Sequence, residues 1–143
     1  MTTPTTSSSP CGLTEVPRFS VAGAFLEGLA TRDFERLGTA LCDEVHLRAL
    51  LPFGLFDRDG ASEVKAAFVR WFSDAQQFEL VDAVVGEVGP RLHLRWRVRL
   101  QAERLGERWF VVEQQAYADT DASDRIQHLS LLCSGYCPER TNG

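Results

Sequence analysis

Three polar side chains in the segment RWFVVEQQAYAD, residues 108–119, could do acid/base chemistry. Glu113, Gln115 and Tyr117 stand at alternate positions, so on a β-strand they share one face. On a concave apolar face the Glu113 carboxylate would lose hydration and could move a proton, while the Tyr117 phenol could donate to a substrate oxygen. Gln115 could orient a ligand without exchanging protons. Two plainer interpretations stay open: Glu113 lies near an open rim or pairs with an arginine, and Tyr117 packs in the core with its hydroxyl in water.

The cysteines offer a weaker chemistry. Cys133 could act as a nucleophile only beside an activating group, and no histidine shares its strand face, because His128 has the opposite parity. We therefore expect a small, buried, apolar Cys133. The sequence has no Cys-x-x-Cys pair and no paired Cys/His spacing, so it predicts free thiols, no metal site and chemistry without a cofactor.

The basic segment RLHLRWRVRL, residues 91–100, has arginine or histidine at every second position. Leucine, valine and Trp96 fill the alternate positions, which is typical of a strand with one buried and one wet face. The chain has a formal net charge of −5, and the basic face of this strand, here called the arginine stripe, carries no Phe, Tyr or Trp on which bases could stack. Nucleic-acid binding is therefore disfavoured. We interpret the arginines as the outer surface of a sheet.

Hydrophobic spacing indicates which elements hold these residues. Apolar positions recur at helical spacing after Ser20, after Asp33 and over residues 61–74, which predicts three helices. A short strand is expected at residues 45–52 and a loop at 53–60. From Phe78 onward the period changes to two, and turn signals separate four expected strands, at residues 78–88, 91–103, 108–119 and 125–136.

Three helices followed by a run of strands define an α+β class. We expect a cone-shaped, curved antiparallel sheet with the three helices of the N-terminal half packed on its concave face. Residues 1–17 are rich in Thr, Ser and Pro and predict a disordered tail. Residues 18–138 are expected to form one domain, and residues 139–143 a flexible tail.

Three stretches resemble the nuclear-transport-factor-2-like superfamily, in particular its SnoaL-like polyketide-cyclase branch. They are FLEGLATRDFERLGTALCDEVHLRALLP, RDGASEVKAAFVRWF and DRIQHLSLLCSGY, in this order along the chain. The resemblance implies a pocket between sheet and helices, and commonly a homodimer. The positions used by the steroid isomerases of that superfamily correspond to Phe25, Ala49 and Gln115, so the base and at least one donor of that mechanism are missing.

The resemblance also implies which side chains face the pocket. With Gln115 pointing inward, Glu113 and Tyr117 point inward as well, and both become candidate catalytic residues. The expected ligand-binding residues are Phe25, Ala49, Trp71, Trp96, Val98, Gln115, Leu131 and Cys133. An apolar cavity with a few polar groups is the usual composition of a small-molecule site.

On the other sheet face we expect a homodimer contact. Apolar residues should join the histidines there, namely Phe110, Val112, Ala116, Leu132 and Tyr136, and such a face usually meets a partner. Arg95 and Arg97 are expected to meet acidic residues such as Glu79 across or beside that interface.

Two functions remain open from the sequence. The first is a cofactor-free acid/base enzyme of the cyclase, isomerase or dehydratase type that acts on a hydrophobic or polyketide-like compound. The second is a non-catalytic ligand-binding or dimerisation module of the same fold. The N-terminus has neither a basic segment nor an apolar segment of the kind that directs secretion, and no apolar run has the length of a membrane helix, so we expect a cytoplasmic protein without a membrane or nucleic-acid partner.

Overall fold

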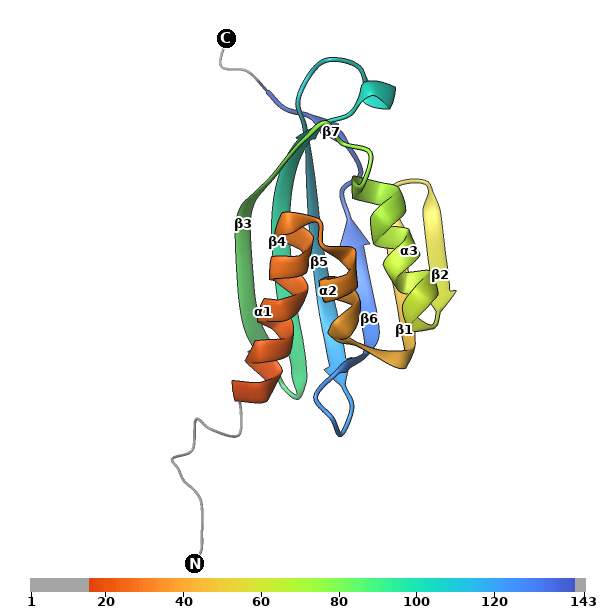
Figure 1. Cartoon of the computed structure of the whole chain (residues 1–143), viewed down its shortest axis with the longest axis vertical. Helices are drawn as coiled ribbons and strands as arrows, with labels where there is room; N and C mark the ends of the chain where they lie inside the picture. Colours follow the sequence, from red (N-terminus) through yellow and green to blue (C-terminus); the bar gives the residue numbers. More distant parts are fainter. Residues whose placement is uncertain (1–15, 141–143) are drawn as a thin grey trace, which may run out of the picture.

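The computed structural model describes residues 16–140 (Figure 1). Within this range three helices and seven strands follow one another. The helices are α1 (Val16–Thr31), α2 (Phe34–Thr39) and α3 (Ala61–Phe72). The strands are β1 (Leu41–Leu51), β2 (Gly54–Asp59), β3 (Gln77–Val88), β4 (Arg91–Gln101), β5 (Phe110–Thr120), β6 (Ile126–Cys133) and β7 (Cys137–Pro138), and a single 3₁₀ turn, η2 (Glu103–Leu105), precedes β5.

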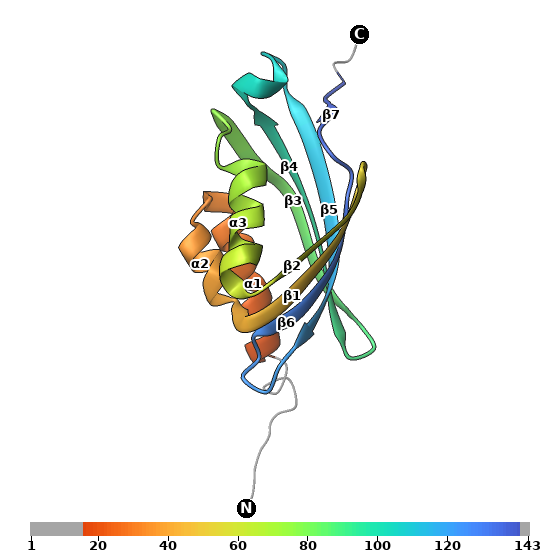
Figure 2. The same cartoon turned by 90° about the vertical axis from the view of Figure 1, so that its right-hand side faces the viewer.

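All strands belong to one sheet of seven, whose order is β2-β1-β6-β5-β4-β3, with β7 paired to β5. Every pairing is antiparallel except that of β1 with β6, which is parallel. The sheet is strongly curved, and all three helices lie on its concave side (Figure 2). The α+β cone expected from the sequence is therefore confirmed, with a mixed rather than purely antiparallel sheet.

The helices dock through apolar residues at helical spacing. On α1, Ala22, Phe25, Leu26 and Leu29 are buried, which is the i, i+3, i+4, i+7 pattern of one helix face. Helix α2 starts after Asp33, whose carboxylate accepts the amide hydrogen of Arg36 as an N-cap.

Close contact between α1 and α2 depends on a glycine. A Cβ added to Gly28 would lie 2.6 Å from the backbone nitrogen of Leu37, closer than real Cβ contacts come. The second helix can therefore pack tightly against the first only because this position has no side chain.

The centre of the core is aromatic. Trp96 on β4 meets Phe25 of α1 and Phe68 of α3, at ring-centroid distances of 5.5 and 6.5 Å. Phe25 and Phe68 contact each other edge to face. The core around Trp96 is thus solidly packed.

Several boundaries differ from the expected ones. Helix α1 begins at Val16, so Ser20 lies inside it, and residues 53–60 form β2 rather than a loop. The tail predictions fall mainly on residues 1–15 and 141–143, which lie outside the described residues. Glu139 is held in place, since its carboxylate pairs with Arg99 at 2.9 Å and its amide donates to the carbonyl of Trp109.

Candidate functional site

The predicted orientation of β5 is wrong by one residue. Gln114 pairs with Trp96 across β4 and β5, and directly paired residues share a face, so the even-numbered residues of β5 face the helices. These residues are buried: Phe110, Val112, Gln114, Ala116 and Ala118. Glu113, Gln115 and Tyr117 consequently lie on the outer, convex face, away from the helices.

Glu113 pairs with arginines of the basic stripe. Its carboxylate lies 2.8 Å from a guanidinium nitrogen of Arg97 and 3.9 Å from one of Arg95. The plainer interpretation of Glu113, an arginine partner, is therefore the one that the geometry supports. Its carboxylate is not directed at the space beneath the helices.

Tyr117 and Gln115 also belong to the outer-face network. The ring of Tyr117 stacks on His93 with centroids 4.9 Å apart, and the guanidinium of Arg91 lies over it. Gln115 hydrogen-bonds to His93 at 3.0 Å. The arginine stripe thus forms a solvated sheet surface, as predicted. Its acidic partners lie within the same chain: Arg95 also contacts Asp82. Glu79, expected to pair with Arg95 or Arg97, pairs with Arg99.

The remaining predicted pocket residues separate into two groups. The inward orientation of Phe25, Ala49, Trp96, Val98 and Leu131 is confirmed, but all five are fully or almost fully buried in the packed core. Only Trp71 and Cys133 reach a cavity. Of the apolar residues expected outside, Phe110, Val112 and Ala116 are buried beneath the helices, whereas Leu132 is exposed.

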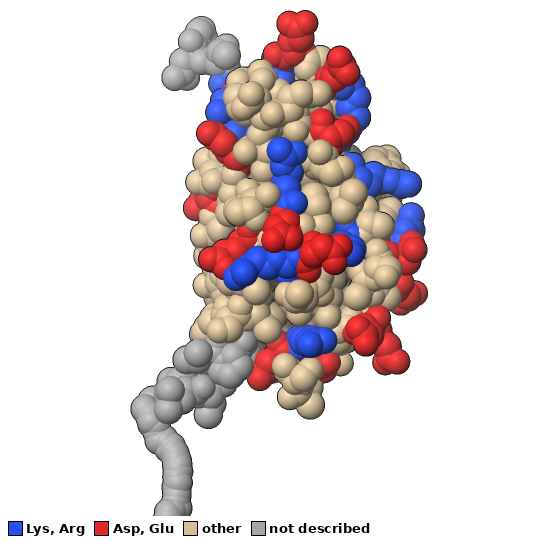
Figure 3. All heavy atoms as spheres, in the orientation of Figure 1, with Lys and Arg blue, Asp and Glu red and all other residues tan. Residues whose placement is uncertain are grey.

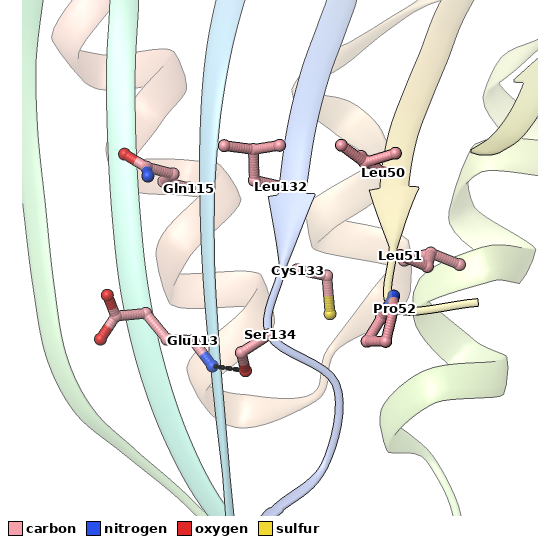
Figure 4. A pocket seen from close by; sticks show the side chains of 8 residues that line it. All are labelled: Leu50, Leu51, Pro52, Glu113, Gln115, Leu132, Cys133 and Ser134. Carbon is pink, nitrogen blue, oxygen red and sulfur yellow. Dashed lines mark hydrogen bonds between the residues drawn. The ribbon is translucent and has the colours of Figure 1, made fainter. Parts of the chain in front are cut away.

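A shallow hollow on the convex face, here called the outer-face pocket, is lined by three of the predicted residues, Glu113, Gln115 and Cys133. It has a volume of about 330 Å³, and Glu113 and Gln115 of β5 border it together with Leu50 and Leu132 (Figure 4). The Ser134 hydroxyl accepts the amide hydrogen of Glu113 at its lower edge. Its small, open form makes it a surface depression rather than an enclosing site.

A larger cavity, here called the cone-mouth pocket, is lined by residues of β1, β2, α3, η2 and β5 and of the turn after β6. This cone-mouth pocket has a volume of about 870 Å³, within the usual range for small-molecule sites. Five aromatic residues line it: Phe53, Phe56, Trp71, Phe72 and Tyr136. Leu51, Leu105 and Val112 add aliphatic wall, and Gln114, Cys133 and Arg58, Arg70 and Arg104 supply polar groups.

Gln114 is the polar residue at the inner end of this pocket. It is 1% exposed and is the one polar side chain fully buried within residues 16–140. Its carbonyl oxygen accepts the indole hydrogen of Trp96 at 2.8 Å, and its amide nitrogen donates to the Cys133 sulfur at 3.3 Å. The Gly135 amide donates to the same sulfur, so Cys133 sits as an acceptor between two N–H groups.

Tyr136 closes the side of the pocket against α3. Its hydroxyl donates to the carbonyl of Trp71 at 2.7 Å and accepts from Arg104 at 2.9 Å. Burial raises the pKa of this phenol, which the neighbouring Arg104 only partly offsets. Tyr136 therefore stays protonated at neutral pH and acts as a hydrogen-bond donor.

Little in the sequence alone points to this site. Gln114 could have been found from the alternation of β5, because its face is the more apolar one, FVQAA against VEQYD. Tyr136 and the three arginines come from elements that meet only in the fold. Hydrophobic spacing along the sequence cannot predict that Arg58 of β2, Arg70 at the end of α3 and Arg104 of η2 line the same cavity.

Surface charge and metal-ligand chemistry add no second site. Acidic and basic side chains intermingle over the helix-bearing face, so no field of a single sign covers it (Figure 3). Within residues 16–140 no group of three or more His, Cys, Asp or Glu side chains is arranged to hold a metal ion. The described helices include none that is long and apolar enough to span a bilayer.

Comparison with solved structures identifies the fold. A candidate polyketide cyclase from Xanthomonas campestris pv. campestris superimposes with a TM-score of 0.63 at 19% identity, covering 82% of this chain and 90% of that one. A candidate SnoaL-like polyketide cyclase from Shewanella putrefaciens CN-32 gives 0.65 at 10% identity, covering 82% and 89%. An LEH-like epoxide hydrolase from M. tuberculosis gives 0.63 at 18% identity, covering 83% and 84%.

The protein has the nuclear-transport-factor-2-like fold. The resemblance noted in the sequence, including that to SnoaL-like structures, is thereby confirmed at the level of the fold. No protein-family model matches the sequence, and no curated protein matches it either. The fold does not define a function, which depends on the side chains of the site.

Proposed function

We propose that this protein binds a hydrophobic, aromatic or polyketide-like small molecule in the cone-mouth pocket. The observation that carries the proposal is the cavity of about 870 Å³ with five aromatic walls and one buried amide. Aromatic walls supply a large apolar contact area, and a few polar side chains in the lining fix orientation. Two structural neighbours described as candidate polyketide cyclases support this ligand class.

Binding is favoured over acid/base catalysis by the chemistry of the lining. No carboxylate and no imidazole lines the cone-mouth pocket within the described chain. Glu113 and Tyr117, the expected acid/base pair, lie on the opposite side of the sheet. Any proton transfer here would have to use Tyr136 or Cys133, and the tyrosine is already committed to Trp71 and Arg104. The non-catalytic module is thus the better-supported of the two functions.

The test is a fluorescence titration with phenylnaphthylamine, a neutral bicyclic probe that emits in apolar surroundings. We expect saturable binding to the wild type and at least about fivefold weaker binding to Trp71→Ala, because a wall of the pocket is removed. Glu113→Gln on the outer face is the control and should bind as the wild type does. If the probe does not bind, or if Glu113→Gln weakens binding while Trp71→Ala does not, the site is assigned wrongly.

For the outer sheet face we propose contact with a second copy of the chain. Leu55, Leu50 and Leu132 occupy directly paired positions on β2, β1 and β6 and form what we call the outer leucine row. Each is about half exposed, at 55%, 51% and 47%. Asp57 and Glu113 near the row are paired with His46 and Arg97, so the leucines are the part of this face that gains most from being covered. The cytoplasmic location expected from the sequence stays a prediction.

A further inference from the structure

We infer that the ligand of the cone-mouth pocket is an organic anion, with an aromatic body inside the pocket and a carboxylate or similar acidic group at its rim. The inference rests on the proposed binding function and specifies its ligand class. It follows from the charges of the lining: three arginines, Arg58, Arg70 and Arg104, and no aspartate or glutamate within the described chain. This local excess is opposite in sign to the net charge of −5 of the whole chain.

Two of the three arginines have no carboxylate partner. Arg104 is committed, since Asp74 accepts from it at 2.6 Å and this contact is the main cause that raises the pKa of Arg104. Arg70, in the last turn of α3, makes no side-chain hydrogen bond or ion pair with another described residue. Arg58 has one N–H bonded to the Asp57 carbonyl and its guanidinium over the Phe56 ring, which leaves most of its donors free.

Strand alternation explains why acids are absent from this rim. Arg58 pairs with the buried Leu47 and therefore projects to the helix side of β2. Asp57 and Asp59 alternate with it and project to the outer face, where Asp57 meets His46 at 2.9 Å. The β2 charges are thus sorted by sign between the two faces, with the positive one at the pocket.

The arrangement suits an amphiphilic anion better than a neutral or a small inorganic one. The aromatic walls take up an apolar body, while Arg58 and Arg70 rise from β2 and α3 on the rim. A guanidinium stacked on Phe56 keeps its planar fork available for two parallel hydrogen bonds to a carboxylate or sulfonate. Inorganic phosphate would use the fork but leave the aromatic cavity empty.

The test compares two probes with the same aromatic skeleton: anilinonaphthalene sulfonate, which is an anion, and phenylnaphthylamine, which is neutral. We expect wild type to bind the sulfonate roughly three- to tenfold more tightly, and the double variant Arg58→Gln/Arg70→Gln to lose that preference. Arg97→Gln removes one positive charge from the outer face and is the control; it should retain the preference. Raising ionic strength should weaken sulfonate binding to the wild type and leave the neutral probe unaffected.

The outcomes separate the two proposals. Equal affinity for both probes in the wild type, with no effect of salt, overturns the anion inference and leaves the binding function standing. If the preference for the sulfonate survives in the double variant but disappears in Arg97→Gln, the anion binds on the outer face, and the anion inference is overturned as well. Failure of both probes to bind overturns the binding function itself. If the double variant does not fold, the salt dependence of the wild type together with the unchanged preference of Arg97→Gln decides the matter.

Discussion

The buried pair of Gln114 and Trp96 shows how one residue links the core to the pocket. The indole N–H of Trp96 donates to the side-chain oxygen of Gln114, with 2.8 Å between nitrogen and oxygen, and both side chains are buried. Gln114→Leu keeps the volume and removes the acceptor, so we expect a loss of about 1–3 kcal/mol in the free energy of unfolding, measured by urea denaturation. Gln127→Leu, the same change at an exposed site of β6, should stay within about 0.5 kcal/mol. If both variants lose the same amount, the hydrogen bond has no role in stability.

A histidine pair on the outer face predicts a pH dependence. The Nδ1 atoms of His46 and His128 lie 3.2 Å apart, so only one of the facing nitrogens can carry a hydrogen. Burial, and next the neighbouring His46, lower the pKa of His128 below its usual value. The groups facing the pair are Arg48 on β1, Asp57 on β2, Arg91 on β4, Asp119 on β5 and Ser130 on β6.

The sign follows from linkage. Because the folded pKa of His128 is lowered, the unfolded chain binds more protons between the two pKa values. Stability is therefore fully present above the ordinary histidine pKa of 6.5 and falls as the pH drops through the folded value. We expect the free energy of unfolding of the wild type to decrease over that window and the decrease to be smaller in His128→Gln. Identical pH profiles for the two proteins would refute the coupling.

At the scale of elements, the turn after β6 shapes the pocket. Gly135 has φ +78°, and a Cβ there would lie 2.6 Å from Cγ of Pro52, another pocket residue. Gly135→Ala should cost about 2 kcal/mol or more and weaken probe binding, because both the backbone and the proline must shift. Gly89→Ala has no neighbour to displace, so it should lower the free energy of unfolding only by the strain of a side chain at φ +59°, about 1 kcal/mol. Equal losses in the two variants would show that the Pro52 contact is unimportant.

The elements were largely predictable because their periodicity is strong. The alternation of residues 91–100 defined both faces of β4 correctly, and the apolar spacing of α3 defined its buried side. The family position of Gln115 predicts the wrong orientation of β5, whereas the apolar content of the two strand faces predicts the right one. The extent of β1 and the strand β2 are hard to predict because a hairpin closed by Pro52 and Phe53 resembles, in its local sequence, a strand followed by a loop.

The pocket itself could not be predicted from the sequence. Its residues come from β1, β2, α3, η2, β5 and the turn after β6, and they meet only because the sheet curves past the helices. Side chains alternate between the two faces of a strand, so a prediction that is wrong by one residue assigns every side chain to the wrong face. For this reason Glu113, Gln115 and Tyr117, expected to face the pocket, lie on the outer surface. The cavity is a property of the whole cone.

On the scale of the whole molecule, the two faces of the sheet have separate roles. The concave face carries the helices and the cone-mouth pocket, and the convex face carries the arginine pairs and the outer leucine row. A change to the leucine row should therefore alter association without altering ligand binding. This independence provides the sharpest test of the proposed homodimer.

We expect the wild type to have about twice the 16.0 kDa mass of one chain in light scattering after size exclusion. Leu132→Glu places a charge at the β6 end of the row, beside Leu50 and Gln115, and should shift the protein to the mass of one chain. Phe19→Glu, on the exposed side of α1, is the matched control and should remain dimeric. Both variants should bind phenylnaphthylamine as the wild type does, because the pocket opens on the other face. A wild type with the mass of a single chain at every concentration, or a Leu132→Glu variant that stays dimeric, rules out this face as the contact between copies.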